Sequence, residues 1–207
     1  AGVTLHARTA GELYSGHAHW DAIAALVEHV DIPVFGNGDI WEPWDALRMI
    51  RTTGAAGVEI GRGCLGRPWL FQDLVSVLSG SEPELTQPTL GLVADTMLEH
   101  VRRLIDFYDQ PENEVVRRFR KHAGWYVAGW PVGRALRQRI HQVSSLEGLA
   151  ELTAGFDRER VLPQEGVRVK RSHSGGPRRV ALPDGWLDDP DEMVELPEAA
   201  EAAASGG

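Results

Sequence analysis

Short apolar strands alternate with amphipathic helices in the first part of the chain, and this alternation constrains the fold more than any other sequence feature. Strand-like segments at 2–8, 32–40 and 57–63 are each followed by a helix-like segment, at 20–30, 43–54 and 68–80. In the first helical segment, four apolar residues have the i, i+3, i+4, i+7 spacing of a buried face: Ile23, Leu26, Val27 and Val30. Strands that alternate with helices predict an α/β fold with a parallel sheet.

Polar and glycine residues directly follow each predicted strand. His6 and Arg8 follow the first strand, the segment 37–39 follows the second, and the segment 61–63 follows the third. Barrels and open parallel sheets both bind ligands at the carboxyl ends of their strands. We therefore expect one ligand site here, although a single histidine at a strand end is more often a hydrogen-bonded structural residue.

After a turn-rich linker, the apolar pattern from residue 88 to 157 has only the helical period. The first predicted helix has an apolar stripe of Met97, Val101, Leu104, Ile105 and Tyr108. A second helix is predicted over 112–127, and a third carries Leu136, Ile140 and Val143. Ser144 followed by Glu147 predicts a capping box that opens a fourth helix. We interpret 1–80 as one domain, 88–157 as an all-α helical bundle, and 158–207 as a mostly disordered acidic tail.

The stretch Gly61 to Gly66 has the letters G-x-G-x-x-G of a dinucleotide-binding loop, but its context differs. Such a loop belongs in the first β/α turn of its domain and needs an acid about twenty residues later, at the end of a following strand. Here two β/α units precede the loop, and no strand follows it. A phosphate site at the last strands of a (β/α)8 barrel suits the context better, with Arg62 as a cation for phosphate oxygens. Glycines that only make tight turns remain the alternative.

Charge is unevenly distributed along the chain. The formal net charge is −9, yet 102–139 holds nine Lys or Arg against four acids, and 184–201 holds eight acids and no Lys or Arg. In the second predicted helix, Arg117, Arg120 and Lys121 share one face, with Arg118 nearby. A solvated helix face is the ordinary explanation of such a run, and a surface that binds an RNA backbone is the functional one.

The remaining composition favours a cytoplasmic protein. No apolar run is long enough for a membrane span, and the N-terminus lacks the pattern of a signal peptide. A single cysteine, Cys64, cannot form an internal disulfide, which agrees with a reducing compartment. The histidines show no metal-ligand spacing, so no metal site is predicted. The chain opens on strand-like residues without an initiator Met, and we expect it to be part of a longer protein.

Three blocks resemble the C-terminal half of bacterial tRNA-dihydrouridine synthases, most closely the B type with an actinobacterial-looking tail. They lie at 6–23, 32–71 and 120–130, and they contain N-G-D, then G-R-G-x-x-G-x-P-W, then R-K-H-x-G-W-Y. The similarity covers approximately residues 1–157. The tandem glycine blocks are highly specific, and the third motif strengthens the match.

The resemblance implies the C-terminal part of an FMN-binding TIM barrel, with about three β/α units as strands six to eight, followed by a helical tRNA-binding domain. In this family NADPH reduces the flavin, which transfers hydride to a uracil, and a cysteine supplies a proton. Matched onto this chain, the residues implied to hold the flavin are His6, Asn37, Gly38, Asp39, Gly61 and Arg62. Those implied to contact tRNA are Arg8, Arg117, Arg120 and Lys121.

The resemblance also implies what this chain lacks. The family's catalytic cysteine lies in an N-x-G-C-P loop that does not occur here, and no catalytic residue is assigned, with His6 given at most an assisting role. The lysine that lines the flavin on strand five is also missing. Cys64 is interpreted as a packing residue. Where the family usually has a small residue such as Ala, this chain has Gly63.

We therefore expect a flavin-dependent tRNA-uridine reductase that is a monomer when complete, represented here by an N-terminally truncated chain that is inactive alone. A catalytically dead tRNA-binding module is the alternative, since three β/α units cannot close a barrel. Another FMN barrel, such as a dihydroorotate dehydrogenase relative, is disfavoured because a small substrate needs no basic helical domain.

Overall fold

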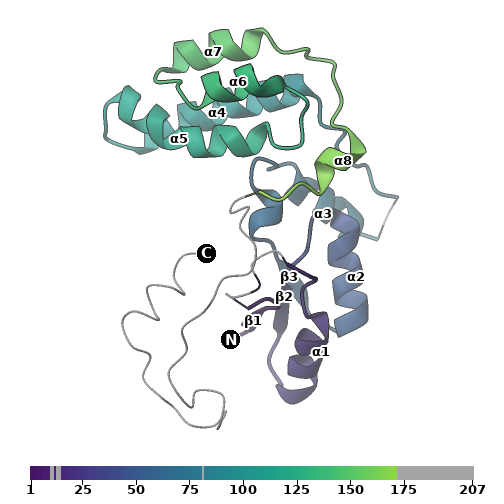
Figure 1. The fold of residues 1–207 in the computed structure, drawn as a ribbon. Coiled ribbons are helices and arrows are strands. Elements are labelled where there is room, and N and C mark those ends of the chain that lie inside the picture. Colours follow the sequence, from purple (N-terminus) through teal and green to yellow (C-terminus); the bar gives the residue numbers. More distant parts are fainter. Residues whose placement is uncertain (10–11, 13–14, 81, 172–207) are drawn as a thin grey trace.

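A three-stranded parallel sheet forms the first unit of the computed structural model, which describes residues 1–9, 12, 15–80 and 82–171. The strands β1 (Val3–His6), β2 (Val34–Asn37) and β3 (Gly57–Glu59) lie side by side in chain order. The helices α1 (Trp20–His29), α2 (Pro43–Thr53) and α3 (Leu70–Leu78) lie on one side of them (Figure 1). The predicted strand–helix alternation is confirmed. We call this part, residues 1–80, the sheet unit.

Close packing of α2 against the middle strand fixes the core of the sheet unit. A Cβ atom on Gly36 of β2 would lie 2.4 Å from Met49 Sδ, so only glycine lets this helix approach. The helix begins with Pro43 in its first turn and ends at Gly54, whose φ is 73°. These are the start and stop signals that the sequence predicted. The buried apolar cluster comprises Ala7, Ile23, Val34, Ile40, Ala46, Met49, Ala55, Leu70 and Leu74.

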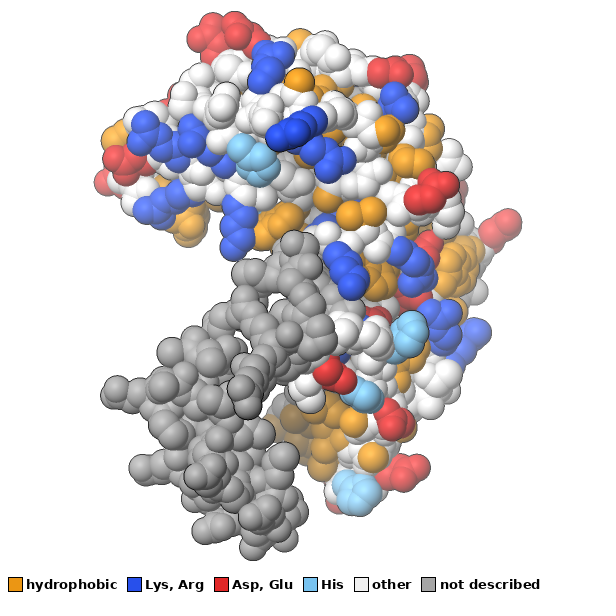
Figure 2. Space-filling view, viewed as in Figure 1, with side chains coloured by type: hydrophobic (Ala, Val, Ile, Leu, Met, Phe, Trp, Pro, Cys, Tyr) orange, Lys and Arg blue, Asp and Glu red, His pale blue; other side chains and the backbone are white. Residues whose placement is uncertain are grey.

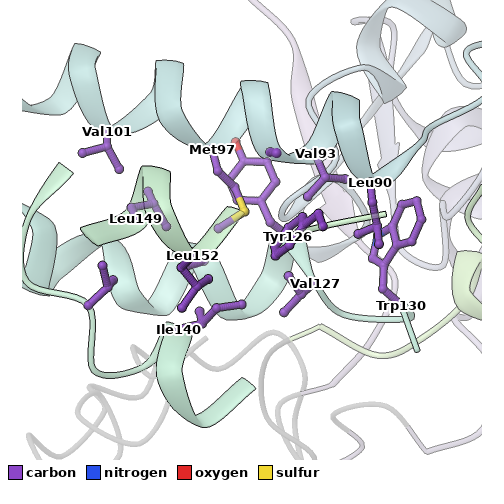
Figure 3. Packing of buried hydrophobic residues seen from close by; sticks show 14 of the residues in the cluster. Leu90, Val93, Met97, Val101, Tyr126, Val127, Trp130, Ile140, Leu149 and Leu152 are labelled. Atoms are coloured by element: carbon purple, nitrogen blue, oxygen red, sulfur yellow. The ribbon is translucent and has the colours of Figure 1, made fainter. Parts of the chain in front are cut away.

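The helices α4 (Leu90–Phe107), α5 (Glu112–Tyr126), α6 (Gly133–Ile140) and α7 (Leu146–Ala154) pack around a second apolar core. Figure 3 shows Met97 and Val101 of α4 facing Leu149 and Leu152 of α7, with Ile140 of α6 nearby. We call these four helices the bundle. In the described part of the chain, no helix is both long and apolar enough to cross a membrane.

The predicted capping box at α7 is one residue out of place. Ser145, not Ser144, precedes the helix, and its hydroxyl accepts a hydrogen bond from Gly148 N at 3.0 Å. Glu147 therefore occupies the second helical position rather than the third, and no reciprocal capping bond is formed through it. Ser144 and Glu147 fit the pattern S-x-x-E and Ser145 does not, but the sequence alone could not show that Ser145 would become the extended residue before the helix.

Residues 158–171 differ from the expectation of a disordered tail. They contain α8 (Gln164–Val167), and Val161 forms an antiparallel bridge with Thr89 of the linker. Leu90 N donates to Arg160 O at 2.9 Å, and Leu162 N donates to Pro88 O at 3.1 Å. Backbone pairing with a distant linker orders this segment, and such pairing leaves no apolar period in the sequence. The rest of the predicted tail lies outside the described residues.

The segment 158–171, which we call the C-terminal segment, lies between the bundle and the sheet unit (Figure 1). Arg168 donates to Asp45 Oδ1 at 2.9 Å and lies 2.6 Å from Glu42 Oε2, both at the start of α2. Arg171 is buried, and its guanidinium donates to the carbonyl of Ala128 in the bundle at 3.3 Å. The C-terminal segment thus connects both units.

Candidate functional site

Side chains at the carboxyl ends of the three strands come together as the sequence predicted. In the parallel register His6 pairs with Asn37, and Asn37 pairs with Glu59 of β3. The imidazole Nδ1 of His6 donates to Asn37 Oδ1 at 2.8 Å. A Cβ atom on Gly61 would lie only 3.9 Å from the amide nitrogen of Asn37. His6, Asn37 and Gly61 therefore form a row across the sheet edge.

This row offers hydrogen-bonding groups to a ligand. The Nδ1 bond to Asn37 leaves Nε2 of a neutral His6 as a hydrogen-bond acceptor. His6 and Gly61 are exposed and Asn37 is half-buried, so the row is accessible from outside. Such a set can bind hydroxyl and phosphate oxygens, because it combines an amide, an imidazole and an exposed glycine.

Arg8 and Asp39 form a bidentate ion pair inside the loops. Arg8 Nε donates to Asp39 Oδ1 at 2.9 Å, and its NH2 group donates to Oδ2 at 2.8 Å. The Arg8 guanidinium also donates to the carbonyls of Ser15 and Gly16. Burial alone would raise the pKa of Asp39, but hydrogen bonds from Arg8 and from Ala18 N hold it below its usual value.

This ion pair changes the roles expected for its two members. Arg8 was expected to contact tRNA and Asp39 to contact the flavin. The side chain of Arg8 is only 4% exposed, and both carboxylate oxygens of Asp39 bind partners within the loops. The pair instead ties the loop after β1 to the loop after β2. The sequence placed both residues at the correct edge but could not show that they would bind each other.

The loop after β2 has an unusual backbone at the site. Gly38 has a φ of 127° and Asp39 has a φ of 55°, so both lie in the left-handed region. The indole of Trp20 donates to Gly38 O at 3.0 Å, and Ala18 N donates to Asp39 Oδ2 at 2.8 Å. These bonds from the start of α1 hold the loop in a strained shape, which is common beside ligand sites.

The glycine-rich loop after β3 forms a single 3-10 turn, η1 (Arg62–Cys64). Cys64 is half-buried, and its thiol donates to Gly61 O at 3.0 Å. Burial raises the pKa of this thiol above its usual value, which opposes thiolate chemistry. The structure therefore agrees with a packing role for Cys64. Arg62 is half-buried in the same turn, directly after Gly61 of the row.

The second half of the same motif connects the two units, a role that sequence reasoning missed. A Cβ atom on Gly66 would lie 2.4 Å from the carbonyl carbon of Trp125 in α5. Arg67 NH1 donates to Trp41 O at 2.7 Å and to Val167 O at 3.2 Å. Trp69 packs in the bundle core rather than in the sheet unit. We call Gly66–Trp69 the joint.

Two of the three predicted basic residues of α5 face solvent, and the third, Arg120, binds backbone carbonyls. Arg117 and Lys121 are exposed, and the Lys121 ammonium lies 5.1 Å from the ring centroid of Trp125. Arg120 Nε donates to Val143 O at 2.6 Å, and its NH2 group donates to Gln142 O. Arg120 therefore closes the turn after α6, and we assign it to the fold. The helical period placed all three on one face without showing this neighbouring turn.

Lys and Arg side chains are grouped over the bundle and continue over the region where the bundle meets the sheet unit (Figure 2). Among the described residues, no group of three or more His, Cys, Asp or Glu is placed to hold a metal ion. The site therefore has a polar row at the strand ends of one unit and a basic surface on the other.

Comparison with known proteins agrees with this arrangement. Residues 1–159 match the family model described as dihydrouridine synthase. The chain belongs to the dihydrouridine synthase family. The resemblance read from the N-G-D, G-R-G and R-K-H motifs is thereby confirmed, and the family fold is a TIM barrel, consistent with the α/β sheet unit.

Curated relatives have the same family name. A probable tRNA-dihydrouridine synthase of Mycobacterium tuberculosis strain H37Rv is 49% identical over 208 residues, which cover 100% of this chain and 52% of that protein. A probable tRNA-dihydrouridine synthase of Mycobacterium leprae is 44% identical, with 100% and 53% covered. The tRNA-dihydrouridine synthase B of Pseudomonas putida is 39% identical over 158 residues, with 76% and 46% covered. The chain thus spans about half the length of these relatives.

Proposed function

We propose that the protein containing this chain reduces uridine to dihydrouridine in tRNA, as a cytoplasmic monomer that uses FMN and NADPH. The family match and the names of the relatives support the reaction. The observation that carries the proposal is the row of His6, Asn37 and Gly61 at the ends of three parallel strands, beside the Gly–Arg turn. No small-substrate reductase needs a basic helical bundle attached to such a row.

The residues of this site fit one side of FMN. Asn37, Gly61 and Arg62 would hold the ribityl and phosphate groups, because they offer an amide, an exposed glycine and a guanidinium at the ends of two neighbouring strands. His6 would lie beside the flavin ring, oriented by its bond to Asn37. Gly38 and Asp39 would act by shaping the loop. When bound, FMN supplies the hydride chemistry, which no side chain of this chain can provide.

The bundle would bind the tRNA backbone through exposed cations. Arg117 and Lys121 are suited to this because their side chains are exposed on α5. Arg118, also exposed, lies over the ring of Tyr108, with 5.6 Å between its guanidinium carbon and the ring centroid. Electrostatic contacts of this kind give affinity without choosing a sequence, so they do not determine which uridine is reduced.

We propose that this chain alone binds FMN weakly and does not turn over. Three strands cannot surround a flavin, and Phe35 in the middle strand is 38% exposed. The test joins this chain to the N-terminal half of the Mycobacterium tuberculosis relative and compares it with the chain alone. Flavin absorbance of the purified proteins and NADPH-dependent formation of dihydrouridine in tRNA are measured.

The joined protein should copurify with flavin and form dihydrouridine, and the chain alone should do neither. Asn37→Ala in the joined protein should weaken FMN binding about tenfold, the cost of one or two lost polar contacts. Asn113→Ala, on the exposed start of α5, is the control and should leave FMN binding unchanged. A joined protein that binds tRNA but no flavin would instead favour a tRNA-binding module without chemistry.

A further inference from the structure

A cavity of about 510 Å³ lies at the meeting of the sheet unit and the C-terminal segment, apart from the row of His6, Asn37 and Gly61. Four separate stretches of the chain line it: the loop after β1 together with the first residue of α1, the loop after β2, helix α2, and the C-terminal segment. Its volume falls within the range of roughly 300 to 1,000 Å³ that is typical of small-ligand sites. The lining residues Arg168 and Lys170 lie beyond residues 1–159, which match the family.

The lining of this cavity is rich in cations. Arg8, Arg48, Arg168 and Lys170 line it together with His17, against a single lining acid, Asp39. Asp39 is already paired with Arg8. Arg48 and Arg168 are 57% and 50% exposed, and both pair with one carboxylate, Asp45, whose side chain is only 1% exposed. Arg168 also pairs with Glu42, and Arg8 is buried, so the cations exposed to solvent in this lining are Arg48, Arg168 and Lys170.

Two indoles complete the lining. Trp20 and Trp41 both contribute to the wall, and the Arg48 guanidinium lies 5.6 Å from the ring centroid of Trp20. Indole faces and guanidinium planes are the surfaces on which unstacked bases lie in protein–RNA complexes. Cations beside them are suited to the phosphate of the same nucleotide. A simple anion would need no aromatic wall.

We propose that this cavity binds a single nucleotide, with its base against Trp20 and Trp41 and its phosphate at Arg48 and Lys170. An RNA strand is the source we favour, because Lys and Arg side chains gather where the bundle meets the sheet unit (Figure 2), and the C-terminal segment that lines the cavity lies between these two units (Figure 1). This inference rests on the proposed tRNA substrate and adds a contact outside the strand-end row. It also gives the C-terminal segment a role in binding, since Arg168 and Lys170 form one wall.

The test compares binding of fluorescently labelled tRNA to this chain and to the variant Arg48→Ala/Lys170→Ala. We expect about tenfold weaker binding by anisotropy at low salt, because the variant loses two cations placed to contact a phosphate. Arg51→Ala is the matched control, since Arg51 is exposed one turn later on α2 and does not line the cavity. In the variant Asp45 still accepts hydrogen bonds from Arg168 and from the backbone N–H of Trp41, so we expect the fold to be maintained.

Photocrosslinking gives a second readout that a general loss of charge would not produce. A short oligouridylate containing 4-thiouridine should crosslink to peptides that carry Trp20 or Trp41, and excess UMP should suppress these crosslinks. Crosslinks confined to bundle peptides would overturn the proposal, and equal tRNA affinity of the variant would reject RNA as the occupant of the cavity.

Competition with free nucleotides distinguishes an RNA strand from a free nucleotide as the occupant of the cavity. If NADPH or UMP suppresses the crosslinks to Trp20 and Trp41 peptides while the double variant keeps its tRNA affinity, the cavity is a nucleotide site but RNA is not its occupant. Arg117→Ala/Lys121→Ala tests the proposed function separately. If that variant loses tRNA binding while the cavity variant keeps it, only the cavity proposal fails.

Discussion

At the scale of single residues, the Arg8–Asp39 pair supports the loops that present the candidate flavin site. The Arg8 side chain is almost completely buried, and Asp39 provides both of its bidentate contacts. Asp39→Asn should lower the free energy of unfolding by about 3 kcal/mol, since it leaves a buried guanidinium without its counter-charge. Urea unfolding measures this loss. Asp31→Asn, at an exposed position, is the control, and an equal effect of both changes would contradict a structural role for the pair.

Tyr126 predicts a stability change at high pH. Burial raises its pKa from 10.0 to about 12, and its hydroxyl lies 3.1 Å from His100 Nδ1. A raised pKa means that the folded state favours the neutral phenol. Stability is therefore complete below pH 10 and is lost as pH rises toward 12, by about 3 kcal/mol for two pKa units.

Tyr126→Phe should remove this loss, because it has no proton to release. Thermal melts between pH 9 and 12 would show a flatter profile for this variant than for the unaltered chain. Tyr108→Phe is the control, since Tyr108 is 37% exposed at the end of α4. If both variants have the profile of the unaltered chain, burial of Tyr126 does not control alkaline stability.

At the scale of elements, the joint determines how α5 lies against the sheet unit. Gly66 has a φ of 67°, and a Cβ atom there would lie within 2.5 Å of three backbone atoms of Trp125 and Tyr126. Gly66→Ala should therefore lower the free energy of unfolding by about 3 kcal/mol, from backbone strain and from separation of the two elements.

Gly80→Ala provides a matched control for Gly66→Ala. Gly80 has a similar φ of 78°, but a Cβ atom there would have nothing within 4 Å. It should cost only about 1 kcal/mol, the strain of the left-handed backbone alone. The difference between the two variants in urea unfolding measures the contact across the joint. Equal losses would mean that Trp125 moves away freely.

At the scale of the whole molecule, the basic residues of α5 have two different kinds of partner. Arg117 and Lys121 face solvent, and Arg120 binds carbonyls after α6. Arg117→Ala/Lys121→Ala should weaken tRNA binding and reduce the slope of log affinity against log salt by about 2, one for each lost phosphate contact. Its melting temperature should remain unchanged.

Arg120→Ala should have the opposite result. Loss of its bonds to Val143 O and Gln142 O should lower the melting temperature of the bundle, and the salt slope should remain unchanged. Titrations of labelled tRNA at several salt concentrations and thermal melts separate these outcomes. A reduced slope in Arg120→Ala would return this residue to the tRNA surface, where the helical spacing alone had placed it.

Local patterns along the chain were enough to predict several parts of this protein. Apolar periodicity predicted the three parallel β/α units and the helix over 112–127, and Pro43 and Gly54 marked the ends of α2. The motifs indicated the family, which the match over residues 1–159 confirms. These features are readable because helix and strand periods, caps and motifs each lie within a short stretch of chain.

Contacts between groups far apart in the chain could not be predicted in this way and are visible only in the folded protein. Arg8 pairs with Asp39, Arg120 donates to a carbonyl in the turn after α6, and Gly66 lies directly against the backbone of α5. Backbone hydrogen bonds to the linker order residues 158–171, and Arg168 binds Asp45 at the start of α2. A charged side chain or a glycine has the same letter whether its partner is solvent or a distant carbonyl. Its role therefore depends on long-range packing, which no local period records.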